Sequence, residues 1–247
     1  MNNDLFSLKA RLSAETVKLM DDILEKTDGT LTARALHPGE APFESITAGL
    51  DINDYTAVLL VKDFATVPEA AVIHELLHLH RYWVEGVPQL IGLDHAMQQS
   101  IGLIENSLEH LVIVPRQSGF ERKDPDYWNA GSRQEWEELF PQWLLLDRTG
   151  LPFKRRLLMA WLRTHIATDG ELVDQARSLL KDCGFLETSE AFKSRAVALL
   201  DHKELLVETI IEAFGYDRLR LALRYFGTGF RQPSVRLLRF TEAGRAS

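Results

Sequence analysis

The amino-acid sequence predicts an α+β protein that is mostly helical. Short runs rich in Val, Ile, Leu and Thr lie between residues 30 and 61 of the 247-residue chain, and turn residues separate them. Such runs are typical of a small sheet. Apolar residues recur at helical spacing on both sides of this region, most often after residue 115. We therefore expect an N-terminal part that combines a small sheet with helices, followed by a helical subdomain.

The chain begins with an amphipathic segment. Apolar side chains recur every three or four residues over residues 6–26, and Gly29 follows them, which predicts one helix. Strand-like runs then cover residues 30–37, 43–52 and 55–61. Proline, glycine and an Asn-Asp pair separate these runs, as is typical of turns. The prediction is a sheet of two to four strands.

Residues 68–84 predict a single buried helix that contains an H-E-x-x-H motif. Apolar residues surround most of this helix, and Pro68 suits its first turn. Side chains four residues apart share a helix face, so His74 and His78 can bind one metal ion while Glu75 lies beside it. Zinc is the expected ion, because it accepts neutral imidazoles and carboxylates and keeps a fourth position open for water.

A second helix is predicted over residues 100–112, where Glu105 and Glu109 fall on or beside an apolar stripe. Carboxylates rarely face a core without a cation or paired hydrogen bonds. We interpret Glu105 as the third zinc ligand and Glu109 as the acid that orients a ligating histidine. The reverse assignment stays open, as does a solvated pair in salt bridges. Without a metal, His74 and His78 would be core histidines satisfied by hydrogen bonds.

These two motifs together resemble the gluzincin branch of the zincin metallopeptidases, whose second motif is a glutamate with an acid one turn later. Glu105 follows His78 by 27 residues. The apolar stretch that ends at Pro115 is also similar to that of the ImmA/IrrE-like group. The resemblance covers roughly residues 50–115. It implies a zincin-like N-terminal part with the H-E-x-x-H helix and a zinc metallopeptidase of narrow specificity.

Hydrolysis of a peptide bond would follow from such a site. Glu75 would act as general base, taking a proton from a zinc-activated water and passing it to the leaving amine. A further donor to the oxyanion is expected. The candidates are Tyr82, His80, His95, His110, Tyr127 and Tyr225. The resemblance also implies that an exposed strand near the cleft, such as residues 55–61, pairs with the peptide substrate.

Beyond residue 115 the chain becomes helical. A polar stretch up to residue 129 predicts a loop, and helical apolar spacing then recurs in five segments. The segments are residues 132–146, 152–166, 171–181, 189–200 and 203–214. Four tryptophans are expected in their core: Trp128, Trp136, Trp143 and Trp161. We therefore predict a metallopeptidase core over residues 1–118 and a helical subdomain over residues 119–247 that closes the cleft.

The composition indicates a soluble, cytoplasmic protein. Cys183 is the single cysteine, which favours a reducing compartment, and no apolar run is long enough to cross a membrane. The formal net charge of −8 gives no strong nucleic-acid signal. Residues 218–247 hold seven Arg and one Glu. This basic tail could form an edge strand or contact an acidic partner, and we favour its docking on the acidic remainder of the chain. The expected partner is a peptide or protein substrate; the alternative is a non-catalytic regulatory or binding protein with a zincin fold.

Overall fold

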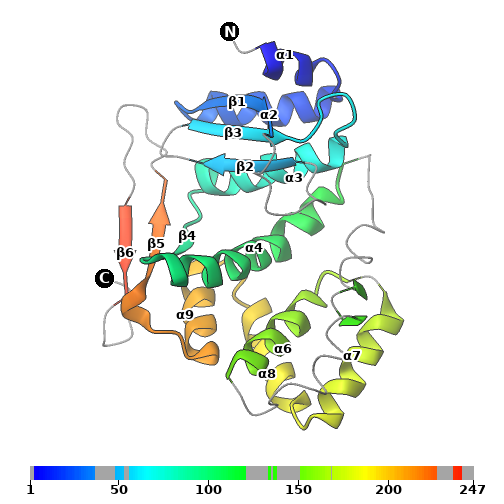
Figure 1. Cartoon of the computed structure of the whole chain (residues 1–247), viewed down its shortest axis with the longest axis vertical. Helices are drawn as coiled ribbons and strands as arrows, with labels where there is room; N and C mark the ends of the chain where they lie inside the picture. The colour runs from blue at the N-terminus through cyan, green and yellow to red at the C-terminus, as the bar shows by residue number, and fades with distance from the viewer. Residues whose placement is uncertain are drawn as a thin grey trace. The chain divides into compact units, whose positions relative to one another are not determined.

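A computed structural model of the chain describes residues 3–36, 48–52, 56–120, 133–134, 136–137, 151–167, 169–226 and 236–240. In these residues the protein is α+β and mostly helical, as the sequence predicts (Figure 1). The zincin-like character of the N-terminal part stays a prediction.

The chain packs into two compact units that are each discontinuous in sequence. The first contains Met1–Gln89, Arg116–Lys123 and Leu223–Leu238, and the second contains Leu90–Pro115, Asp124–Ala222 and Arg239–Ser247. This division differs from the predicted boundary at residue 118. The reason is that the chain passes between the units several times, so that one long helix and the strands of the second sheet contribute residues to both.

The first unit contains a sheet with helices packed against it. Its elements are α1 (Asn3–Lys9), α2 (Ala14–Lys26), β1 (Thr30–Ala35), β2 (Ala48–Ile52) and β3 (Thr56–Val61). Strand β3 lies in the middle, parallel to β1 and antiparallel to β2. The single helix predicted over residues 6–26 is two helices, because Ser13 breaks it and caps α2: its hydroxyl accepts a hydrogen bond from the Thr16 amide.

The helix that carries the H-E-x-x-H motif is α3 (Glu69–Leu79), which continues into a π-helical turn, η1 (His80–Val84). Its apolar side chains share one buried cluster with the sheet and with α2. The cluster includes Met20, Ile23, Leu31, Leu59, Val72, Leu76 and Leu79. Glu69, in the first turn, accepts hydrogen bonds from the Ser13 amide at 2.8 Å and the Thr16 hydroxyl at 2.5 Å. Both core packing and these bonds therefore hold α3 in place.

The remaining elements include β4 (Gln89–Gly92), α4 (His95–Gln117), α6 (Leu151–Arg163), α7 (Gly170–Asp182), α8 (Leu186–Val197) and α9 (Lys203–Phe214). They end with η2 (Arg218–Arg220), β5 (Leu221–Tyr225) and β6 (Arg236–Arg239), and the second sheet has the order β4-β5-β6. Four of the five predicted C-terminal helices are confirmed, whereas residues 132–146 lie largely outside the described residues. Trp136 and Trp161 are core residues as predicted, and Trp128 and Trp143 are also outside the described residues.

One arginine of the basic tail does bind an acid within the chain. Both oxygens of Asp94 accept hydrogen bonds from Arg220, each at 2.8 Å. Arg220 also lowers the pKa of Asp94 to about 2. Asp94 caps α4 as well, because its Oδ1 accepts from the Met97 amide. In the described part of the chain, no helix is both long enough and apolar enough to span a membrane.

Gly92 provides a test of how β4 packs against the start of α4. A Cβ atom at this position would lie 2.3 Å from the backbone nitrogen of Gln98 and 2.5 Å from the carbonyl carbon of Met97. Backbone atoms in a helix cannot rotate away, so we expect Gly92→Ala to lower the free energy of unfolding by about 2 kcal/mol. Chemical denaturation measures the change. Gly102→Ala is the matched control, since a Cβ there meets nothing within 4 Å; equal stabilities of the two variants would contradict this packing.

Candidate metal site

His74 and His78 lie together on one face of α3, as their spacing predicts. Their ring centroids are 4.9 Å apart and the rings are nearly perpendicular, at 83°. His78 is buried and His74 is partly buried. The His78 ring stacks on Tyr82 of η1 at 6.3 Å, and Tyr82 in turn packs against Phe226 at 5.7 Å. Packing therefore restricts the orientation of both imidazoles.

The His74 imidazole is neutral at physiological pH. Burial lowers its pKa to about 4, although a hydrogen bond with Gln117 opposes this change. A metal ion binds the neutral form, because only that form has a lone pair on a ring nitrogen. His74 is thus prepared to act as a ligand without first losing a proton.

The last turn of α4 is fastened to α3 and η1. Gln117 Oε1 lies 3.2 Å from Nδ1 of His74, and Gln117 Nε2 donates to the carbonyl of Ala70 at 3.0 Å. Next to it, Arg116 donates to the carboxylate of Glu85. Three side-chain contacts therefore attach the end of this helix to the segment that contains the H-E-x-x-H motif.

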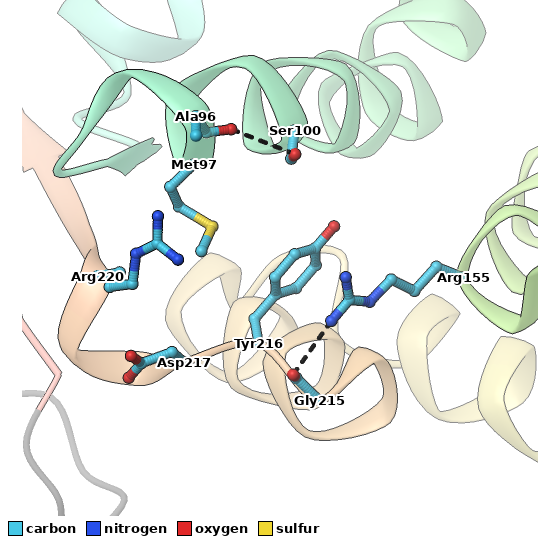
Figure 2. Close-up of a pocket in the computed structure, with 8 residues that line it drawn as sticks. All are labelled: Ala96, Met97, Ser100, Arg155, Gly215, Tyr216, Asp217 and Arg220. Carbon is cyan, nitrogen blue, oxygen red and sulfur yellow. Dashed lines mark hydrogen bonds between the residues drawn. The ribbon is translucent and has the colours of Figure 1, made fainter. Parts of the chain in front are cut away.

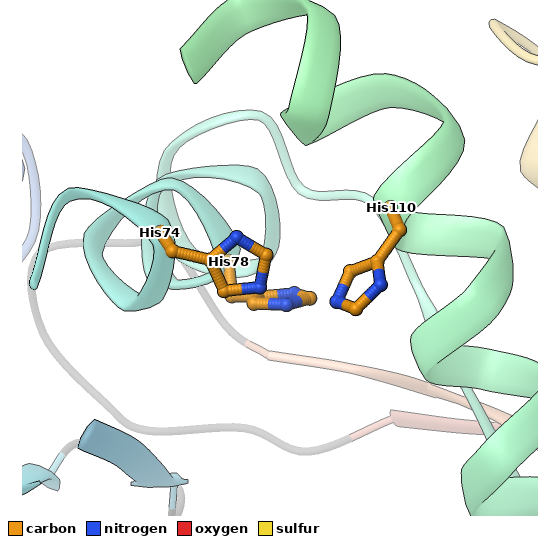
Figure 3. A group of neighbouring side chains, drawn as sticks. All are labelled: His74, His78 and His110. Atoms are coloured by element: carbon orange, nitrogen blue, oxygen red, sulfur yellow. The ribbon is translucent and has the colours of Figure 1, made fainter. Parts of the chain in front are cut away.

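A third histidine completes a possible ligand set. Among the described residues, His74, His78 and His110 form a group whose ligand atoms all lie within 4.8 Å of one another (Figure 3). His110 is buried and lies on α4, seven residues before Gln117. Seven residues are about two helical turns, so His110 and Gln117 are on the same face of α4.

The donor set fits zinc. Zn–N bonds of about 2.0–2.1 Å in a tetrahedron put ligand nitrogens roughly 3.4 Å apart. The nitrogens here are no more than 4.8 Å apart. Side-chain movements on the order of 1 Å would bring three imidazoles to bonding distance, and three protein ligands leave one position open, as in catalytic zinc sites.

Glu105 and Glu109 have a different partner from the predicted one. Lys203, the first residue of α9, donates to Glu105 at 3.0 Å and to Glu109 at 2.6 Å, and all three side chains are buried. Burial alone would lower the pKa of Lys203, but the two carboxylates raise it above its usual value. Glu105 and Glu109 therefore share Lys203 as an ion-pair partner, and in the described part of the chain Glu105 is not in the group formed by the three histidines.

Helix geometry explains this difference from the prediction. Successive residues of a helix are about 100° apart around its axis, so Glu109 and His110 point to different faces. The apolar spacing correctly indicated that both carboxylates are buried, and the cation that the described structure shows beside them is the ammonium group of Lys203. Lys203 is 94 residues from Glu109 in sequence, and no local pattern identifies such a partner. The sequence analysis named His110 only as a candidate oxyanion donor. Its position within an apolar helical run could have indicated that its side chain is buried and needs a polar partner or a metal ion.

Glu75 is partly buried on α3, beside His74 in sequence. Burial raises the pKa of its carboxyl to about 8. Near neutral pH such a group can both hold and release a proton, which is what a general base and acid must do. A cation nearby would favour the charged form.

The other candidate oxyanion donors have varied surroundings. His80 contacts Glu85 at 3.1 Å, and His95 is exposed and contacts Gln99 at 3.1 Å. Tyr82 stacks on His78 at 6.3 Å. Tyr225 is in β5, and Tyr127 lies outside the described residues. Tyr82 therefore has a described ring contact with one histidine of the group.

A pocket of about 360 Å³ lies elsewhere in the second unit (Figure 2). Its lining residues are Ala96, Met97, Ser100, Arg155, Gly215, Tyr216, Asp217 and Arg220. Arg155 donates to the carbonyls of Phe214 and Gly215 and lies 4.0 Å above the Tyr216 ring, so it satisfies the end of α9. Ser100 is ten residues before His110 on α4, roughly 15 Å along the helix, so this pocket is separate from the histidines.

The geometry thus selects His74, His78 and His110 as the residues that could hold a metal, with Glu75 as the adjacent titratable group. This set differs from the predicted set by one ligand. No model of a known protein family, no curated protein and no solved structure matches this chain.

Proposed function

We propose that this protein is a zinc-dependent peptidase in which His74, His78 and His110 hold the metal. The group of three imidazoles is the single observation that carries the proposal. Glu105, predicted as the third ligand, is replaced in this role by His110. When bound, zinc would polarise a carbonyl and make a water molecule acidic enough to react at neutral pH.

Glu75 is proposed as the general base and acid of the reaction. Its carboxylate would take a proton from the attacking water and then give it to the amine that leaves. Burial raises the pKa of Glu75 to about 8, which supports the second step. A carboxyl with this pKa can keep the proton near neutral pH and pass it to the leaving amine, which is more basic. Its position next to His74 supports the first step.

An extended peptide is the substrate that the first sheet supports. Strand β3, which lies within the run predicted to pair with substrate, is in the middle of this sheet and already has a neighbour on each side. In the described sheet, β2 is an edge strand, and it packs against α3. An edge strand can accept another strand through backbone hydrogen bonds, so β2 is the better candidate for holding a peptide beside the metal helix.

Substitution of Glu75 tests the proposal. We expect wild-type protein purified without added metal to contain close to one zinc per chain. Glu75→Gln should keep this zinc but hydrolyse a mixed peptide library about 10²–10⁴-fold more slowly, because the proton acceptor is gone while the ligands remain. Elemental analysis gives the metal content, and mass spectrometry of the library gives the cleavage rate.

Glu15→Gln is the matched control, since Glu15 is exposed on α2, and it should change neither quantity. Absence of zinc from the wild type would overturn the metal site. Zinc binding without any cleavage would overturn the peptidase proposal and favour a non-catalytic regulatory or binding protein.

A further inference from the structure

We infer that Gln117 is a positioning residue: it fixes the tautomer of His74 so that Nε2 is the metal-binding nitrogen. The consequence for zinc rests on the proposed function, whereas the tautomer itself does not. Neither the H-E-x-x-H motif nor the predicted acid Glu109 provides this contact. Gln117 comes from the last turn of α4 and reaches α3 with both ends of its amide group.

The contact with Ala70 determines how the Gln117 amide is oriented. A carbonyl oxygen can only accept a hydrogen bond, so the group that faces the Ala70 oxygen at 3.0 Å must be the NH₂ of Gln117. The oxygen of Gln117 therefore faces His74. Because Ala70 is one turn before His74 on the same helix, a single side chain can reach both.

The orientation of the amide then determines the state of the imidazole. Gln117 Oε1 can only accept, so Nδ1 of His74, 3.2 Å away, must carry the hydrogen. A histidine binds a metal as the neutral imidazole, and in that form only one of its two ring nitrogens carries a hydrogen. Nε2 consequently carries a lone pair and no hydrogen. Figure 3 agrees, because one ring nitrogen of His74 lies toward the His78 ring and the other points away from it.

The Gln117 amide reaches the His74 ring from outside the H-E-x-x-H helix, because it belongs to the last turn of α4. Partners of this kind restrict the ligand ring and increase its basicity. Their loss typically lowers metal affinity 10- to 100-fold.

Two substitutions of Gln117 separate positioning from general support of the fold. Gln117→Met removes both hydrogen bonds, and we expect zinc affinity, measured by competition with a chelator, to fall 10- to 100-fold. Gln117→Glu keeps an acceptor for His74 but cannot donate to Ala70, and we expect it to restore affinity to within a few-fold of wild type. If Gln117 acted only as support for the helix end, Glu would not rescue, because the Ala70 bond is lost in both variants. Gln99→Met, at an exposed position of the same helix, should have no effect.

The tautomer can be read in metal-free protein, independently of zinc. We expect ¹⁵N NMR of the His74 ring to show a protonated Nδ1 and an unprotonated Nε2 in the wild type and in Gln117→Glu, and a mixture in Gln117→Met. A wild-type ring with its hydrogen on Nε2 would overturn the inference, even if Gln117→Met failed to fold. If the expected tautomer is found but zinc does not bind, the positioning by Gln117 stands and the proposed function fails.

Discussion

Lys203→Met is expected to lower the free energy of unfolding by about 3–5 kcal/mol. Lys203 is the cation that the buried carboxylates of Glu105 and Glu109 contact at 3.0 and 2.6 Å. Methionine has a similar volume and lacks the charge, so it would leave two neighbouring acids without this partner inside the protein. Removing one member of a buried ion pair is costly because the remaining charge has lost both water and its counter-charge.

Denaturant titration at two pH values measures this effect and tests its cause. A protonated carboxyl is cheaper to bury than a carboxylate, so the variant should lose less stability at pH 5 than at pH 8. Lys203 itself has a raised pKa, so in the wild type its contribution is fully present below about pH 10.5 and is constant over this window.

The triple variant Lys203→Met, Glu105→Gln, Glu109→Gln is the control for this interpretation. It removes the acids along with the lysine, and we expect it to recover most of the lost stability and to show no such pH dependence. A single Lys203→Met variant as stable as wild type at pH 8 would mean that these carboxylates do not depend on the lysine.

Local sequence patterns predicted the elements of this fold better than their partners. The apolar helix around His74 and the strand runs near residues 48–61 were identifiable because helical and strand periodicity are properties of neighbouring residues. The break at Ser13 was missed because apolar residues continue at helical spacing on both sides of it. A capping residue such as Ser13 begins a new helix but leaves the apolar spacing unchanged. Local patterns carry no information on the two-unit division, because each unit joins segments far apart in sequence, such as residues 223–238 with the N-terminal residues.

The same distinction applies to the candidate site. The shared face of His74 and His78 follows from their spacing of four residues on one helix. The proposal of His110 in place of Glu105 as third ligand draws on the grouping of the three histidines and on the contact of Lys203 with Glu105. Both observations join residues far apart in sequence. The sequence therefore predicted a need for a cation near Glu105 without showing which cation it is.

Paired substitutions of His110 and Glu105 will show which residue is the third ligand. We expect His110→Ala to weaken zinc binding more than 100-fold, beyond the loss caused by removing an outer partner of a ligand. Glu105→Gln should retain zinc affinity within a few-fold, because its carboxylate contacts Lys203 in an ion pair. Competition with a chelator measures both affinities.

X-ray absorption at the zinc edge gives an independent count of the ligands. Three imidazoles are expected in the wild type and in Glu105→Gln, and two in His110→Ala. The opposite result, with zinc lost from Glu105→Gln and retained by His110→Ala, would restore the ligand set of two histidines and one glutamate. In that case Lys203 would have to leave Glu105 when the metal binds. The ammonium group of Lys203 lies 3.0 Å from the Glu105 carboxylate, and a zinc ion bound to the same carboxylate would repel it strongly.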